Sequence, residues 1–235
     1  MDSMNKNHTN QITQDRTKIR ISEYGFKEEL LNIITHGVGT LLSIIGLVVL
    51  YQQASSKGTY LHLVSYIVFG STLVALYLAS TLYHSFANTK FNKFFKKIDH
   101  LSIYFLIAGT YSPLMLIGIE GPVGLIMIKV IWGLVIVSCI FKFSKNKILQ
   151  KLAFMNYLLM GWLVVIVLDK LFVNISTRSM YLLIAGGLFY TIGVIFYLWE
   201  KLPFNHSIWH LFVLGGSTSH YFSIYSLLAI ESLDS

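Results

Sequence analysis

The last long apolar segment of this chain opens with His206-Ser207-Ile208-Trp209-His210. Two histidines that are four residues apart lie on one face of an α-helix, one turn from each other. Such a pair can bind one metal ion, but structural zinc takes four protein ligands and catalytic zinc usually takes three with a water. Taken alone, the pair is better explained by ordinary helix packing or an interfacial role. The metal hypothesis therefore requires further ligands elsewhere in the chain.

The composition is that of an integral membrane protein. Hydrophobic residues make up 54% of the 235 residues and charged residues only 12%, whereas soluble domains carry about 25% charged residues. The formal net charge of +7 comes from loops beside apolar segments, so we read it as a topology signal and expect no nucleic-acid partner. The one cysteine, Cys139, lies inside an apolar segment, so any transition metal must be held by histidine and carboxylate side chains.

Seven apolar segments follow a polar N-terminal stretch. Residues 1–27 contain no apolar core and no signal-peptide h-region, so we expect a mobile cytoplasmic tail, followed by a transmembrane domain over 28–232. Lys57-Gly58, Gly121-Pro122 and Pro203 separate neighbouring segments. Each segment is close to the roughly 20 residues that cross a bilayer, where the backbone must be helical. The sequence predicts an all-α, seven-transmembrane helix bundle in the plasma membrane. The segments lie near 30–51, 60–86, 99–118, 121–141, 148–168, 180–200 and 207–230.

The distribution of positive charge predicts the orientation of this bundle. Of the 18 Lys and Arg residues, 14 lie in the tail and around the loops after the second, fourth and sixth segments. Cytoplasmic loops of membrane proteins carry the excess of positive charge. We therefore expect the N-terminus in the cytoplasm and the C-terminus outside. The four residues assigned to the other side are Lys57, Lys129, Lys170 and Arg178.

This orientation brings polar side chains from distant segments to one level, near the cytoplasmic side of the membrane. The second segment runs inward and ends near Ser80 and His84. The third segment begins there with Asp99, and the seventh begins there with His206 and His210. Ionisable groups at membrane depth are costly and point to a functional site by default. That several such groups meet at one depth is stronger evidence for a functional site than any single group is.

The chemistry of these groups fits a zinc site. His84, His206 and His210 provide three neutral nitrogen ligands, which is the number found in an open zinc site with water in the fourth position. Asp99 is the carboxylate placed to hold or deprotonate that water, because zinc already lowers its pKa toward 7. We therefore predict zinc as the cofactor and Asp99 as a catalytic residue.

The assignments of Ser80 and Asp99 leave alternatives open. Ser80 precedes His84 by four residues on the same helix face, so it can orient an imidazole or bind a substrate carbonyl. A local hydrogen bond within the helix explains it equally well. Asp99 can instead be a helix N-cap beside the Lys96/Lys97 cluster.

The first segment also begins on the cytoplasmic side and supplies weaker candidates. Glu29, Asn32 and His36 can brace the metal ligands as supporting residues. A plain helix start explains Glu29 and Asn32 nearly as well, and helix packing explains His36 equally well. His62 lies at the outer end of the second segment, far in depth from this cluster, and His100 is not expected to be a ligand.

These motifs together resemble a known family. Ser80-x3-His84, Asp99 and His206-x3-His210, with a first motif over residues 28–37, are similar to the hemolysin III branch of the progestin and adipoQ receptor superfamily. The resemblance covers nearly the whole chain from about residue 25. It implies zinc on His84, His206 and His210, Asp99 holding the water on that zinc, and an N-in, C-out topology. It also implies a link to metal-dependent lipid hydrolysis through relatives that are associated with ceramide, while the short tail argues against hormone sensing.

Three functions remain in view. The first is a zinc-dependent hydrolase of a lipid amide or ester bond, with a membrane lipid as its substrate and Asp99 moving the proton. The second is a non-enzymatic membrane sensor or cytolysin with a structural zinc. The third is haem ligation by a histidine pair, which a visible spectrum tests. The sequence identifies no protein partner and no oligomeric state.

Overall fold

The structure is a computed structural model that describes residues 23–119 and 121–228, and all regular secondary structure in those ranges is helical. Residues 1–22 of the predicted tail lie outside the described residues. The helices are α2 (Phe26–Lys57), α3 (Tyr60–Ser85), α4 (Asn92–Leu116), α5 (Pro122–Phe143), α6 (Lys147–Trp162), the 3-10 helix η1 (Leu163–Val167), α7 (Leu168–Asn174), α8 (Thr177–Leu198) and α9 (Asn205–Tyr225).

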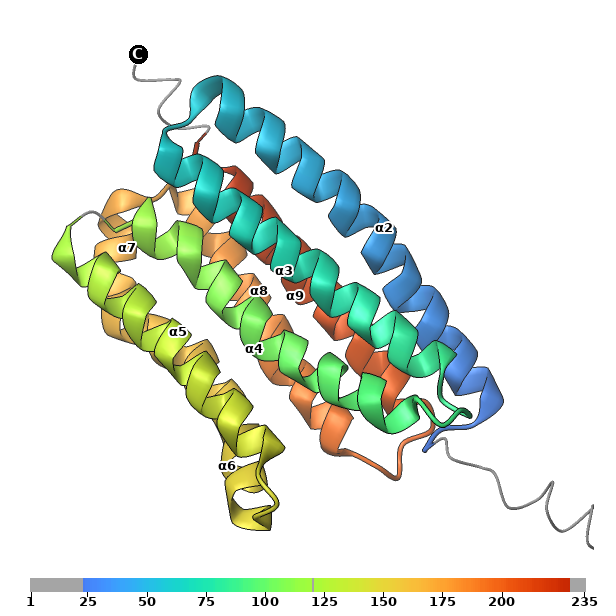
Figure 1. Cartoon of the computed structure of the whole chain (residues 1–235). Helices are drawn as coiled ribbons and strands as arrows, with labels where there is room; N and C mark the ends of the chain where they lie inside the picture. Colours follow the sequence, from blue (N-terminus) through green and yellow to red (C-terminus); the bar gives the residue numbers. More distant parts are fainter. Residues whose placement is uncertain (1–22, 120, 229–235) are drawn as a thin grey trace, which may run out of the picture.

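The long helices run side by side in one bundle (Figure 1). Helix α3 packs between α2 and α4, and α9 packs against both α2 and α8. Helices α5 and α6 follow on the other side of α4. The start of α2, the α3–α4 connection and the α8–α9 connection gather at one end, and α9 ends at the opposite end (Figure 1). Segments that are far apart in the sequence therefore meet at one end of the bundle.

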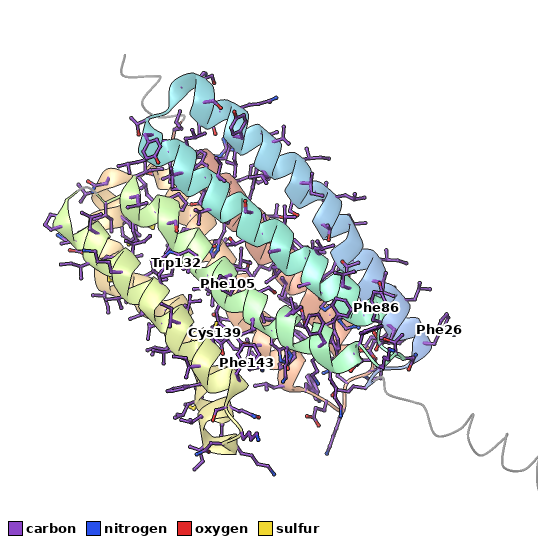
Figure 2. All side chains as sticks on the ribbon, viewed as in Figure 1. Phe26, Phe86, Phe105, Trp132, Cys139 and Phe143 are labelled. Atoms are coloured by element: carbon purple, nitrogen blue, oxygen red, sulfur yellow. The ribbon has the colours of Figure 1, made fainter. Side chains whose placement is uncertain are left out.

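The outer surface of the bundle is strongly apolar. Five helical segments are long and apolar enough to cross a membrane: α2, α3, α5, the stretch from α6 through α7, and α8. Leu41 and Ile45 on α2 are 65% and 61% exposed, and side chains rich in carbon project from the outer faces throughout Figure 2. Surfaces of this size face lipid rather than water. The chain is a multi-pass membrane protein, as the composition predicted.

Helices α4 and α9 are not among these five segments because their composition is more polar. Lysines and Asp99 occupy the first turns of α4, and histidine and serine recur along α9. Both helices pack against two or more neighbours, so they bury polar groups inside the bundle. The site described below lies where these two polar helices meet α2 and α3.

The buried face of α2 explains how closely this helix can approach the bundle. Its buried residues recur every three or four positions, which is the period of one helix face. The middle of the face carries small residues, and a Cβ built on Gly39 would lie 2.5 Å from Cδ1 of Tyr77 on α3. Small residues allow close helix packing in membranes. The buried residues are Glu29, Asn32, His36, Gly39, Ser43, Gly46, Leu50 and Ala54.

Two helix boundaries differ from the predictions. Helix α4 begins at Asn92 rather than near residue 99, and its N-cap is Phe91, so the interpretation of Asp99 as an N-cap is wrong. Amphipathic residues between 92 and 98 extend the helix before the apolar run begins, and hydropathy alone misses them. The predicted fifth segment is interrupted by η1, where the helix tightens over Leu163–Val167.

The predicted breaks between segments are present. Lys57 ends α2 and Gly58 caps it. Gly121 has a φ of 87°, a conformation that favours glycine, and Pro122 is the first residue of α5, where its missing N–H leaves no bond unmade. Pro203 precedes Phe204, which has a φ of 58° and precedes the start of α9.

Candidate metal site

Three histidines from two helices surround one point in the bundle. His84 comes from the last turn of α3, and His206 and His210 come from the first two turns of α9. Each of the three offers a ligand atom within 4.8 Å of the others, and all three side chains are buried. The ring centroid of His84 is 5.1 Å from each of the other two, which are 4.7 Å apart. These residues are close enough to hold one metal ion.

The connection before α9 places its two histidines at this point. Phe204 turns the chain in the left-handed conformation, and the Asn205 side-chain amide then donates to the carbonyls of Phe196 and Tyr197 at the end of α8. These bonds add a side-chain donor to two carbonyl groups in the last turn of α8. The first turn of α9 is thereby fixed against α8, with His206 and His210 facing α3.

A carboxylate on α2 holds His84. Oε2 of Glu29 is 2.6 Å from Nδ1 of His84, and both side chains are buried. A carboxylate only accepts hydrogen bonds, so Nδ1 carries the proton and Nε2 keeps its lone pair. Among the described residues, this buried Nε2 has no hydrogen-bond partner. The arrangement is that of a metal-binding histidine oriented by a carboxylate.

Hydroxyl groups hold the other two histidines in the same way. The Thr35 hydroxyl donates to the Leu31 carbonyl at 2.8 Å, so its oxygen is free to accept from Nδ1 of His210, 3.2 Å away. The Tyr24 hydroxyl is 3.1 Å from Nδ1 of His206. A phenol both donates and accepts, so Tyr24 can accept from Nδ1 while Nε2 of His206 binds a metal.

The three residues that contact the Nδ1 atoms come from one segment of the chain. Glu29 and Thr35 lie on α2, and Tyr24 precedes it by two residues. Burial raises the pKa of the Tyr24 hydroxyl far above its usual range, so this group stays neutral. One segment therefore supplies the carboxylate and both hydroxyls that orient the histidines.

Asn32 and His36 complete the α2 side of the site. The side-chain oxygen Oδ1 of Asn32 accepts a hydrogen bond from the Ser207 hydroxyl at 2.6 Å, which links α2 to α9. His36 stacks on His210 with ring centroids 3.5 Å apart and an interplanar angle of 13°, and its edge-on neighbour is Tyr77. These are the contacts of supporting residues, and His36 is outside the group of three that can share a metal.

Asp99 and Ser80 lie beside the histidines rather than among them. Ser80 is buried one turn before His84, and Asp99 is half-buried on α4. The Asp99 carboxylate interacts electrostatically with His84 and with the Ser80 side chain. The structure therefore brings all the predicted site residues to one end of the bundle, whereas His62 lies at the opposite end of α3.

Sequence reasoning missed Tyr24 and Thr35 and gave Glu29 too little weight. Thr35 follows Asn32 by three residues, so the helical period carries a signal for it. Tyr24 lies in a polar stretch before α2, and no pattern there singles it out. Glu29 was predicted only as a weaker supporting residue, with a plain helix start as the alternative, and its carboxylate contacts His84 directly.

Comparison with known proteins places these residues in context. The family described as Haemolysin-III related matches residues 24–221. The chain is 46% identical to Hemolysin-3 of Bacillus cereus over 198 residues, covering 84% of this chain and 90% of the relative. It is 42% identical to the Hemolysin-3 homolog of Bacillus subtilis (strain 168) over 201 residues, covering 86% and 94%. It is 30% identical to the human Monocyte to macrophage differentiation factor over 207 residues, covering 86% and 84%.

Proposed function

This chain belongs to the haemolysin-III-related family of membrane proteins, and we propose that it is a zinc-dependent hydrolase of a lipid amide or ester bond. The observation that carries the proposal is the buried group of three histidines, whose Nδ1 atoms are all engaged from α2 or the residues just before it. Three oriented imidazoles with a nearby carboxylate are the parts of an open, catalytic zinc site.

The donor set fits zinc. Neutral imidazole nitrogen is a common zinc ligand, and three protein ligands leave a coordination position open. The Nε2 atoms of His84 and His206 are buried and have no hydrogen-bond partner among the described residues. Buried polar atoms are normally paired, so these nitrogens are suited to a metal ion. His84, His206 and His210 would hold it.

The residues around this site have separate tasks in hydrolysis. A zinc ion bound there would polarise the scissile carbonyl and make water a stronger nucleophile. Asp99 takes a proton from the attacking water and returns it to the leaving amine or alcohol. Ser80 donates a hydrogen bond that orients the Asp99 carboxylate or the substrate carbonyl. Glu29 keeps the proton of His84 on Nδ1 throughout.

The proposed substrate is a membrane lipid that enters sideways from the cytoplasmic leaflet. We place all seven helical segments across the plasma membrane, with the N-terminus in the cytoplasm and the C-terminus outside. The excess of Lys and Arg on one side supports this orientation. It puts the histidines at the level of the cytoplasmic headgroups, where a lipid ester or amide bond lies.

The substitution Asp99→Asn tests the hydrolase proposal, because it keeps the shape of the side chain and removes its basicity. Zinc content and product release are measured on the same samples of parent and variant, with ceramides, phospholipids and acyl-amides as substrates. We expect nearly unchanged zinc in Asp99→Asn and turnover reduced by about 10²-fold or more, the usual range for a general base. A zinc-loaded parent that is inert toward all three substrate classes would contradict the proposal.

The names of the bacterial relatives motivate a second candidate function. In it the chain is a non-enzymatic membrane sensor or a cytolysin that lyses cells, and the zinc is structural. Two of them are named as hemolysins. In that case Asp99→Asn would change metal affinity or stability rather than turnover, since a partner of the ligands is worth about 10–100-fold in metal binding. The same two measurements therefore separate the two candidates.

A further inference from the structure

A lysine beside the metal site is bound to a histidine rather than to an acid. Lys142 lies in the last turn of α5, and its Nζ donates to Nδ1 of His100 on α4 at 2.8 Å. The carbonyl of His100 accepts a 2.7 Å hydrogen bond from the Tyr157 hydroxyl on α6. Three helices therefore fix the position of this pair, which the proposed reaction leaves unused.

The ammonium of Lys142 has Asp99 in its electrostatic surroundings but is not held in an ion pair among the described residues. Lys142 is half-buried, and it forms no ion pair with any carboxylate in residues 23–119 and 121–228. An ammonium has three N–H donors, and His100 accepts only one of them. Lys96 adds a second positive charge nearby, but Glu23 already pairs with it at 2.5 Å. Lys142 is therefore placed to bind an anion.

This pair is close to the proposed reaction. Asp99, the neighbour of His100 on α4, interacts electrostatically with both Lys142 and His84. A group held by Lys142 would therefore be near the carboxylate to which we assign proton transfer. In a phospholipid, only a few bonds separate the phosphate from the acyl ester carbonyls.

Exposed apolar and aromatic residues lie on the same two helices as the pair. Phe94 and Ile98 on α4 and Phe143 on α5 are exposed large hydrophobic residues. Further along the same two helices, the ring centroids of Phe105 and Trp132 are 6.2 Å apart. Figure 2 shows Trp132, Cys139 and Phe143 along α5, with Phe105 on the neighbouring α4. A cation next to such a surface matches a charged headgroup with acyl chains.

We propose that Lys142 and His100 bind the phosphate of a membrane phospholipid, and that this subsite selects phospholipids as substrates. The role of the subsite in selecting a substrate rests on the proposed hydrolase function, whereas binding of the phosphate does not. Lys142 supplies the charge, and His100, fixed by Tyr157, keeps the ammonium at the α4–α5 contact. A hydrogen bond between charged groups is stronger than a neutral one, so this contact is expected to dominate headgroup affinity.

Lipid binding to the purified full-length protein tests the subsite. Native mass spectrometry measures the occupancy of dioleoyl phosphatidylglycerol and of dioleoylglycerol, which has the same chains without the phosphate. We expect the phosphatidylglycerol to bind more tightly, and Lys142→Gln to weaken it by about tenfold, as expected for loss of one charged hydrogen bond. Lys142→Arg keeps the charge and should retain binding, and Lys145→Gln is the control because Lys145 is exposed at the same end.

Three results of the binding experiment would overturn the inference. They are equal occupancy by both lipids, equal weakening in Lys142→Gln and Lys145→Gln, and displacement of the lipid by inorganic phosphate at matched concentrations. Binding is measured without turnover, so the two proposals fail separately. A lipid bound through Lys142 to an inert protein keeps the subsite and rejects the hydrolase, whereas phospholipid turnover that is unchanged in Lys142→Gln keeps the hydrolase and rejects the subsite.

Discussion

At the scale of single residues, each histidine of the site divides its two nitrogens between the protein and the proposed metal. Nδ1 of His84 faces Glu29 at 2.6 Å, and Nδ1 of His210 faces Thr35 at 3.2 Å. These contacts select the tautomer in which Nε2 keeps its lone pair. We therefore expect the affinity of the site for metal to depend on residues that do not contact the ion.

Glu29→Gln tests this dependence at His84. The substitution keeps the size of the side chain and removes the charge that favours a proton on Nδ1. We expect zinc affinity to fall by about 10–100-fold, the usual effect of losing a ligand's hydrogen-bond partner. Glu23→Gln is the control, because Glu23 is exposed and pairs with Lys96 instead. Equal zinc affinity in the two variants, measured by competition with a chelator, would show that Glu29 does not tune the site.

His36 provides a second test at this scale, because its ring stacks on that of His210 at 3.5 Å. His36→Phe keeps an aromatic ring in the stack, whereas His36→Ala removes it. We expect His36→Phe to retain most of the zinc affinity and His36→Ala to lose about tenfold, within the range for supporting residues. A loss of similar size in both variants would mean that the imidazole nitrogens, rather than the stack, support the site.

The residues of the site were predictable to different degrees. His84, His206 and His210 could be found because rare ionisable groups at one membrane depth stand out. Thr35 and Tyr24 could not, because hydroxyl groups are common at helix starts and within helices. The physical reason is that a supporting residue is defined by the atom it contacts, and sequence periodicity gives only the helix face.

At the scale of elements, α2 is the helix that supports the site. It carries Glu29, Asn32, Thr35 and His36, and it approaches α3 closely at Gly39. Its position therefore controls both the packing of the bundle and the orientation of the histidines. The sequence predicted that α2 begins beside the site, but the early start of α4 and the interruption at η1 depend on packing that hydropathy does not record.

Gly39→Ala tests the role of this close approach. The added Cβ would lie 2.5 Å from Tyr77, so α2 must shift or the ring must move. We expect a loss of about 1–3 kcal/mol in stability, as for an overpacked core, together with weaker zinc binding. Gly37→Ala is the matched control on the same helix, since its Cβ would lie 3.9 Å from Thr81. Thermal unfolding in detergent makes the comparison, and equal melting temperatures would contradict it.

At the scale of the whole molecule, the orientation in the membrane decides from which leaflet a substrate arrives. Two single-cysteine variants, Lys145→Cys and Arg178→Cys, each in a Cys139→Ser background, report on the two sides of the membrane. We expect an impermeant thiol reagent added to intact cells to label Arg178→Cys and to spare Lys145→Cys, because Lys145 lies on the side with most of the Lys and Arg residues, which we propose to be cytoplasmic. A reporter fused after Ser235 should be outside. The reverse pattern would move the site to the outer leaflet.

The general architecture was predictable because the bilayer restricts the choices to helices of a given length. The all-helical fold is confirmed, and five of the helical segments qualify as membrane spans. The other two long helices, α4 and α9, contribute Asp99, His206 and His210 to the candidate site, and their polar residues lower their hydropathy. The polar residues that we assign to the site are therefore also the ones that weaken the hydropathy signal.

The zinc content of the purified protein and its histidine variants tests the central claim most directly. We predict about one zinc per chain in the parent, because three imidazoles suit one tetrahedral ion. His84→Ala, His206→Ala and His210→Ala should each lose most of it, while His62→Ala, at the far end of α3, should keep it. Parent protein without zinc, or equal zinc in His210→Ala and parent, would contradict the account.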